Sequence, residues 1–233
     1  MKHIVVTGGA KGIGRAIVED LAEQGYRVTA TFHASDTEAK TLTEKYEYVN
    51  FIQVNLEDRQ ELDKAIDELL RADPIDVLIN NAGLYVGKAF EKMSETELYQ
   101  QSDLNIVAPA RLIQGLLPSL HKSVAPLVIN ISSQAGHGRL TGEAMYSAVK
   151  AAISTLSYVL RAELNPKGVR VTAVEPYGVN TYDIPEPSDM LLPRELAEVV
   201  RNIIEQPDHI QLDTVVVSHI RQSRPDYPEW VEQ

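Results

Sequence analysis

The 233-residue chain contains no cysteine. Without thiols it can form no disulfide, no thiolate metal site and no cysteine nucleophile. Positive charge is also scarce, because 22 Lys and Arg stand against 33 Asp and Glu, a formal net charge of −11. A protein with this net negative charge does not attract a nucleic acid or an anionic membrane, and we expect neither as a partner.

Long apolar runs and metal-ligand patterns are missing as well. The first apolar stretch, Ile4-Val5-Val6, is interrupted by Thr7-Gly8-Gly9 and is too short for a signal sequence or a membrane span. The histidines are scattered, with no spacing typical of a metal site. We therefore expect a cytoplasmic protein without a bound metal. The length predicts one domain over 1–233, in which 221–233 could form an extended tail because two prolines follow the last predicted strand.

What the sequence does contain is an alternation of short β-branched runs with longer segments of helical periodicity. This alternation predicts an α/β fold: a single Rossmann-type, doubly wound domain with a seven-stranded, mainly parallel sheet and helices on both faces. The strands are expected at 3–7, 27–32, 49–54, 75–79, 126–131, 169–175 and 213–217. One helix is expected between the first two strands, and others near 37–46, 58–72, 94–118, 142–164 and 194–205.

A glycine-rich turn, Thr7-Gly8-Gly9-Ala10-Lys11-Gly12-Ile13-Gly14, follows the first strand and opens a helix. Glycines let a backbone turn tightly and approach a pyrophosphate, whose charge the helix N-terminal amides favour. A dinucleotide would be bound there. Alternatively, the turn binds no ligand and simply starts the helix. No Gly-Lys-Ser or Gly-Lys-Thr follows, which disfavours a nucleoside triphosphatase.

Tyr146 and Lys150 lie four residues apart in a predicted helix, which places both side chains on one face. An ammonium group beside a phenol stabilises the phenolate and lowers the pKa of the hydroxyl, so Tyr146 becomes a plausible acid. Taken alone, this pair is more often a surface tyrosine beside a solvated lysine.

Together these motifs resemble the short-chain dehydrogenase/reductase family, from Lys2 to about Ile220. The matching pieces occur in the family's order: Thr7-Gly8-x-x-x-Gly12-x-Gly14, Asn80-Asn81-Ala82-Gly83, Asn105, Ser133, Tyr146 and Lys150. Ser133 lies 13 positions before Tyr146, the separation usual in the family, and Ser132 is the reserve candidate. The last third is similar to NADP-dependent hydroxy-acid dehydrogenases and sepiapterin reductase-like members, and less so to 3-oxoacyl-carrier-protein reductases.

The resemblance implies hydride transfer between a nicotinamide and a carbonyl or alcohol carbon. Ser133 would hold the carbonyl oxygen, Tyr146 would donate the proton, Lys150 would lower the pKa of Tyr146, and Asn105 would maintain a proton relay. The implied cofactor-binding residues are Gly8, Ala10, Lys11, Gly12, Ile13, Gly14, His33, Asn55, Leu56, Asn81, Ala82, Gly83, Tyr146, Lys150, Pro176, Val179 and Thr181. The family also implies a homodimer or homotetramer, formed through the helices at 94–118 and 142–164.

The end of the second strand bears on the choice of cofactor. No acid stands at Phe32, where a carboxylate would bind the ribose hydroxyls of NAD, whereas Lys11, His33 and Ser35 could receive a 2′-phosphate. NADP(H) is therefore favoured. NAD(H) stays possible, because Asp36 could supply a carboxylate if the strand ended late.

Two positions depart from the family pattern. Asn55 stands where Asp is common, and its amide oxygen could still accept a bond from adenine. Tyr177 replaces a usual glycine and points either toward the substrate pocket or outward.

The expected activity is NADP(H)-dependent reduction of a small to medium carbonyl compound, or the reverse oxidation of a secondary alcohol such as a hydroxy acid. The stretch Tyr182–Leu192 is short and contains Pro185 and Pro187, which predicts a stiff loop rather than a helical lid and so favours compact substrates. The alternatives are a 3-oxoacyl-thioester reductase and, in another class, a nucleotide-sensing regulator without turnover.

Overall fold

The computed structural model describes residues 1–72, 74–138, 141–181 and 189–222. Seven strands form one sheet in the order β3-β2-β1-β4-β5-β6-β7, and each neighbouring pair is parallel. The strands are β1 (His3–Val6), β2 (Arg27–Phe32), β3 (Val49–Gln53), β4 (Val77–Asn80), β5 (Leu127–Ile131), β6 (Arg170–Pro176) and β7 (Thr214–Val217). The predicted seven-stranded parallel sheet is confirmed.

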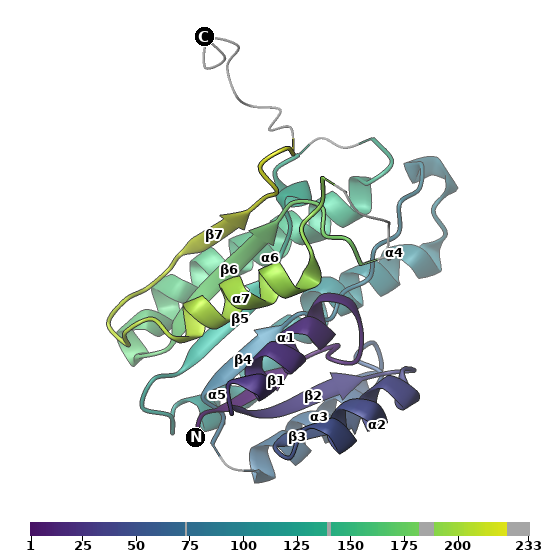
Figure 1. The fold of residues 1–233 in the computed structure, drawn as a ribbon. Coiled ribbons are helices and arrows are strands. Elements are labelled where there is room, and N and C mark those ends of the chain that lie inside the picture. Colours follow the sequence, from purple (N-terminus) through teal and green to yellow (C-terminus); the bar gives the residue numbers. More distant parts are fainter. Residues whose placement is uncertain (73, 139–140, 182–188, 223–233) are drawn as a thin grey trace.

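Helices cover both faces of this sheet (Figure 1). One face carries α1 (Gly12–Glu23), α2 (Asp36–Lys45) and α7 (Pro193–Ile204), and the other carries α3 (Arg59–Arg71), α5 (Ala108–Leu120) and α6 (Ala144–Leu164). Successive strand residues point to opposite faces, so Ile4 and Val6 pack in the first core while Val5 packs in the second. This two-sided burial explains why central strands such as β4 begin with an uninterrupted apolar run, Val77-Leu78-Ile79.

The helix predicted at 94–118 is divided. It consists of α4 (Glu95–Ser102), a π-helical turn η2 (Asp103–Val107), and α5. Pro109 has no backbone N–H and cannot donate to the carbonyl of Asn105 four residues earlier, while the Ala108 amide reaches back five residues to Asp103. Sequence periodicity could not show this change of winding, because the buried residues of α4 and η2 are the polar Gln101 and Asn105, which add nothing to an apolar stripe.

The strand order reverses beside β1, where the chain leaves β1 toward β2 and later returns to β4 on the other side. In open α/β sheets, the crevice for ligands lies at the carboxyl ends of the strands at such a point. The segments after β1, β4, β5 and β6 meet at this edge, and they contain the predicted site residues Gly8, Asn81, Ser133 and Thr181.

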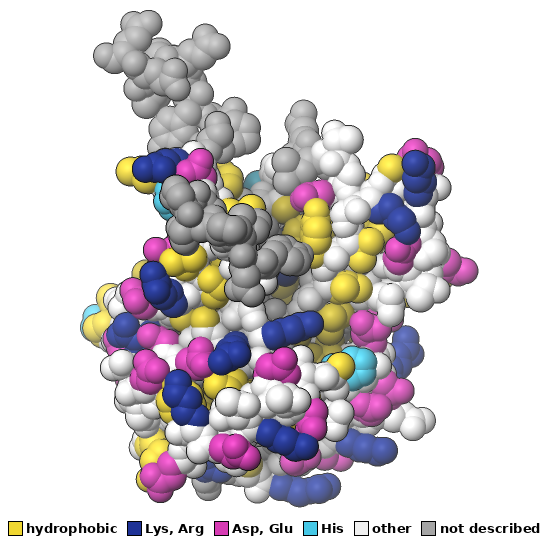
Figure 2. All heavy atoms as spheres, turned by 45° about the vertical axis from the view of Figure 1, so that its right-hand side comes forward, with side chains coloured by type: hydrophobic (Ala, Val, Ile, Leu, Met, Phe, Trp, Pro, Cys, Tyr) yellow, Lys and Arg dark blue, Asp and Glu magenta, His cyan; other side chains and the backbone are white. Residues whose placement is uncertain are grey.

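Acidic and basic side chains are interspersed over the face drawn in Figure 2, so the net charge of −11 is not gathered into one patch there. Within the described ranges, no helix has the length and apolar character needed to cross a membrane. Most of the predicted tail, residues 223–233, lies outside the described residues.

Candidate active site

The glycine-rich turn is fixed against the end of β4. Gly8 and Gly12 have φ angles of +66° and +56°, a left-handed conformation that side chains disfavour. The side-chain amide of Asn81 donates to the carbonyls of Thr7 and Gly8 at 2.8 and 3.3 Å. A Cβ on Gly14 would lie 2.1 Å from the Gly8 carbonyl oxygen, so only glycine fits there.

The N-terminus of α1 is open to an anion. Lys11 is the N-cap and its side chain makes no capping bond, while the first turn contains no acidic residue. The helix dipole and the first amides therefore favour a negative group, as the pyrophosphate of a dinucleotide would provide. Thr181 borders this place, since its methyl carbon would lie 3.6 Å from a Cβ on Gly12. The residues present fit a dinucleotide.

Lys150 and Tyr146 lie on one face of α6, as their spacing predicts. The ammonium nitrogen of Lys150 is 5.7 Å from the ring centroid of Tyr146 and donates to the carbonyl of Ile131 at 3.0 Å. Lys150 is only 6% exposed. Burial lowers the pKa of Lys150 to about 8, because an ammonium ion is poorly solvated there.

The side chains of Asn105 and Lys150 both lie close to Gly83. A Cβ on Gly83 would lie 2.8 Å from the side-chain oxygen of Asn105 and 3.6 Å from the ammonium nitrogen of Lys150. The side-chain amide of Asn105 donates to the carbonyls of Leu84 and Gln101 at 3.0 and 2.9 Å, while its oxygen is buried without a partner among the described residues. Such an oxygen suits a buried water.

The two candidate serines have different surroundings. Ser132 is buried, and its hydroxyl lies 2.9 Å from the Lys150 carbonyl and 2.8 Å from the hydroxyl of Ser154. Ser133 precedes a 3₁₀ turn, η3 (Gln134–Gly136), and its hydroxyl accepts the Ala135 amide at 3.1 Å. Within the described part of the chain, its own proton reaches only the Pro176 carbonyl, at 3.5 Å. Ser133 is thus freer to bond a substrate than Ser132.

At the other end of the predicted cofactor site, β2 ends at the buried Phe32 and is followed by the exposed His33. Asp36 lies beyond the end of β2, begins α2 and pairs with Lys40 at 2.6 Å. The side-chain oxygen of Asn55 accepts the Glu57 amide at 3.1 Å, which leaves one lone pair for adenine.

Sequence reasoning missed two side chains near the predicted site. The ring of Tyr85 packs edge-on against Tyr146, with centroids 4.9 Å apart, and its hydroxyl donates to Glu143 at 2.9 Å. Glu175, the residue before Pro176, is buried at the end of β6. The sequence could have indicated Glu175, because a carboxylate at the carboxyl end of a buried strand needs hydrogen-bond donors around it.

The structure leaves some predictions untested. The backbone of Tyr177 donates to the Val217 carbonyl at 2.8 Å, which extends the β6–β7 pairing but does not determine where the ring points. Residues 182–188 of the predicted stiff loop lie outside the described residues, and beyond them Leu191 pairs with Val179.

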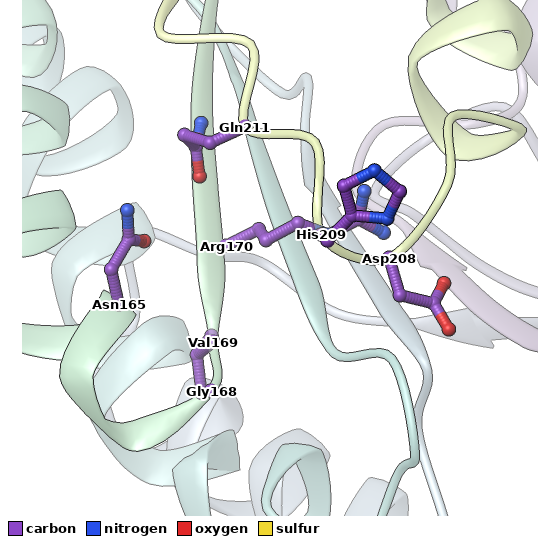
Figure 3. Close-up of a pocket in the computed structure, with 7 residues that line it drawn as sticks. All are labelled: Asn165, Gly168, Val169, Arg170, Asp208, His209 and Gln211. Atoms are coloured by element: carbon purple, nitrogen blue, oxygen red, sulfur yellow. The ribbon is translucent and has the colours of Figure 1, made fainter.

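A hollow of about 180 Å³ lies elsewhere, at the amino end of β6 (Figure 3). It is lined by Asn165, Gly168, Val169, Arg170, Asp208, His209 and Gln211. Arg170 begins β6 and Pro176 ends it, so the strand separates this hollow from the candidate site by about 20 Å. The Arg170 guanidinium donates to the carbonyls of Pro207 and Ile210, which ties the loop before β7 to β6.

Comparisons with known proteins agree with this arrangement. The family model for short chain dehydrogenases matches residues 2–186. An uncharacterized oxidoreductase of Staphylococcus saprophyticus is 30% identical over 228 residues, which cover 93% of this chain and 96% of that protein. A 3-oxoacyl-[acyl-carrier-protein] reductase of Staphylococcus aureus is 33% identical over 180 residues, covering 75% of this chain and 73% of the relative.

Among solved structures, an alcohol dehydrogenase from the archaeon Thermococcus sibiricus, complexed with 5-hydroxy-NADP, superposes with a TM-score of 0.88. It is 27% identical, and the match covers 97% of this chain and 100% of that one. The family match, the parallel sheet and the glycine-rich turn lead to one conclusion: the chain belongs to the short-chain dehydrogenase family of oxidoreductases.

Proposed function

We propose that the protein is an NADP(H)-dependent oxidoreductase that transfers hydride between the nicotinamide and a carbonyl or secondary alcohol of a small to medium substrate. One observation carries the proposal. The buried Lys150 lies against the Tyr146 ring at the same sheet edge as the uncapped start of α1. A proton-donating pair thus stands beside a dinucleotide-binding turn.

In this proposal the chain supplies the proton and the orientation, and the bound nicotinamide supplies or accepts the hydride. The Ser133 hydroxyl donates a hydrogen bond to the substrate oxygen, and Tyr146 gives that oxygen its proton as charge develops. The Lys150 ammonium, 5.7 Å from the centroid of the Tyr146 ring, stabilises the resulting phenolate by its positive charge. The unpartnered Asn105 oxygen would hold a water that returns a proton toward Lys150.

The preference for NADP(H) rests on the end of β2. A 2′-phosphate would meet the exposed Lys11 and His33, with no competing carboxylate at Phe32. The nearest downstream acid, Asp36, lies beyond the end of β2 and pairs with Lys40. The complex of the archaeal relative with 5-hydroxy-NADP supports the same preference.

We also propose a homodimer or homotetramer built through α4, α5 and α6. Tyr99 of α4 and Tyr158 of α6, two helices in contact with each other, are 61% and 69% exposed, and a second copy of the chain would cover these rings. Light scattering at several concentrations tests this, and a monomer throughout would contradict it.

A second candidate is reduction of 3-oxoacyl thioesters, favoured by the 33% identity to the staphylococcal reductase. The two candidates differ in substrate size. We expect compact ketones, keto acids or aldehydes to give a higher kcat/KM than long 3-oxoacyl thioesters. The opposite ranking in a matched series would favour the thioester reductase.

The proposed function is tested by mixing the protein with NADPH and a panel of ketones and keto acids, and following the loss of the reduced cofactor's absorbance. Tyr146→Phe is the matched control, because it removes only the hydroxyl. Losing a general acid costs about 10²- to 10⁴-fold in rate. Cofactor binding without turnover of any carbonyl would instead support a nucleotide-sensing regulator.

A further inference from the structure

Glu175 carries a buried carboxylate that three side chains hold. It is 3% exposed and lies next to the last residue of β6. Its oxygens accept the hydroxyl of Ser154 at 2.7 Å and the side-chain amide of Gln134 at 3.0 Å. The ring nitrogen Nε2 of His137 lies at 3.0 Å. Burying a carboxylate is costly unless such donors compensate, so the contacts bind β6, α6 and the η3 turn firmly together.

These contacts involve the residues that precede and follow Ser133 in the sequence. Gln134 follows Ser133 directly, and His137 ends the 3₁₀ turn that Ser133 begins. Ser132 precedes it, and its hydroxyl lies 2.8 Å from that of Ser154, which donates to Glu175. Both chain neighbours of Ser133 are therefore tied to one carboxylate, Gln134 directly and Ser132 through Ser154.

Ser133 itself has little to fix its hydroxyl. Its donor contact to the Pro176 carbonyl is long, at 3.5 Å, and its acceptor contact comes from within its own turn. Its place relative to Tyr146 must then be set by the segments on either side.

We propose that Glu175 is a positioning residue that holds the Ser133 turn, through Gln134, His137 and Ser154, so that the Ser133 hydroxyl meets the substrate oxygen. This inference rests on the proposed role of Ser133 in carbonyl reduction. Glu175 acts through its neighbours and does not itself touch the substrate.

Two serines of α6 provide a matched test. Ser154→Ala removes the link to Glu175. Ser157→Ala removes a comparable bond on the same helix, because the Ser157 hydroxyl accepts the Asn130 amide at 2.8 Å and has no contact with Glu175. A displacement of about 1 Å at a reacting group can cost about 10²-fold in rate. We expect kcat to fall about tenfold or more in Ser154→Ala and in Glu175→Gln, with an unchanged dissociation constant for NADPH. Ser157→Ala should keep kcat within about twofold of the parent.

A double-mutant cycle separates positioning from general destabilisation. If Glu175 acts through Ser133, adding Glu175→Gln to Ser133→Ala causes no further loss of kcat. The same fold-loss in both backgrounds would overturn the proposal. Should Glu175→Gln fail to fold, Gln134→Ala takes its place in the cycle, because it cuts one of the same contacts from the turn.

Crystal structures of Ser154→Ala and the parent give a readout independent of turnover. A displaced Ser133 turn is expected, and an unmoved turn would overturn the positioning role even if the parent reduces carbonyls. A parent that reduces no carbonyl would refute the proposed function, and the crystallographic comparison would still decide whether Glu175 holds the turn.

Discussion

Replacing Lys150 with methionine should stabilise the cofactor-free protein while abolishing its activity. Methionine retains most of the length and the apolar stem of lysine but has no charge to bury. Burial is the cause that lowers the pKa of Lys150 from 10.5 to about 8, so the folded state holds this ammonium at a cost. Lys150 would thus be needed for catalysis although its buried charge lowers the stability of the folded protein.

The size of the effect follows from that pKa. Lowering the pKa of Lys150 from 10.5 to about 8 costs the folded state roughly 3 kcal/mol at neutral pH. The variant also loses the hydrogen bond from Lys150 to the Ile131 carbonyl, which contributes about 1 kcal/mol. We expect Lys150→Met to be more stable than the parent by about 2 kcal/mol at pH 7.

The stability difference between Lys150→Met and the parent should change with pH. Because the pKa of Lys150 is lower in the folded protein than in the unfolded chain, the unfolded chain binds more protons between pH 8 and 10.5, and the parent gains stability there as pH rises. The advantage of the variant is therefore full below pH 8 and vanishes toward pH 10.5.

Urea unfolding of the cofactor-free proteins at pH 7 and at pH 10 measures this difference. Lys64→Met, at an exposed lysine of α3, is the control and should show little difference from the parent at either pH. A Lys150→Met variant that is less stable than the parent at pH 7, or a difference that does not change with pH, would refute the reasoning.

Three further predictions concern the cofactor site and the proton donor. The kcat/KM for carbonyl reduction should fall as pH rises through about 8, since Lys150 then loses the charge that stabilises the Tyr146 phenolate; a pH–rate profile tests this. Lys11→Ala and His33→Ala should each weaken NADPH binding about tenfold while leaving NADH binding nearly unchanged, as measured by cofactor fluorescence, because each would remove one of the charge-assisted bonds proposed to the 2′-phosphate. Gly14→Ala should abolish cofactor binding or folding, since its Cβ would lie 2.1 Å from the Gly8 carbonyl oxygen; a soluble variant with parental NADPH affinity would contradict the turn geometry.

The sheet was predictable because its strands leave a strong sequence signal. Runs such as Val77-Leu78-Ile79 are apolar on both faces, which only a sheet covered on both sides requires, and each predicted strand boundary lies within two residues of the observed one. Helix α6 was predictable for a similar reason, since its apolar positions recur at helical spacing over 21 residues.

The site was predictable only where local spacing determines geometry. Tyr146 and Lys150 share a helix, so their four-residue separation alone places them on one face. The contact of Tyr85 with Tyr146 and the three partners of Glu175 depend instead on how separate segments meet, and no spacing within one segment encodes that. The π-helical turn at Asn105 escaped prediction because the residues buried there, Gln101 and Asn105, are polar and give no apolar periodicity in which a change of winding would appear.

We propose above that this chain transfers hydride to a carbonyl with Tyr146 as the proton donor. The most direct test uses NADPH deuterated at the transferable position of the nicotinamide, with the parent and Tyr146→Phe each incubated with the best ketone of the panel. Mass spectrometry should find deuterium on the new alcohol carbon with the parent, and about 10²- to 10⁴-fold less product with Tyr146→Phe. An alcohol without deuterium, or equal labelled product from both proteins, would contradict the account.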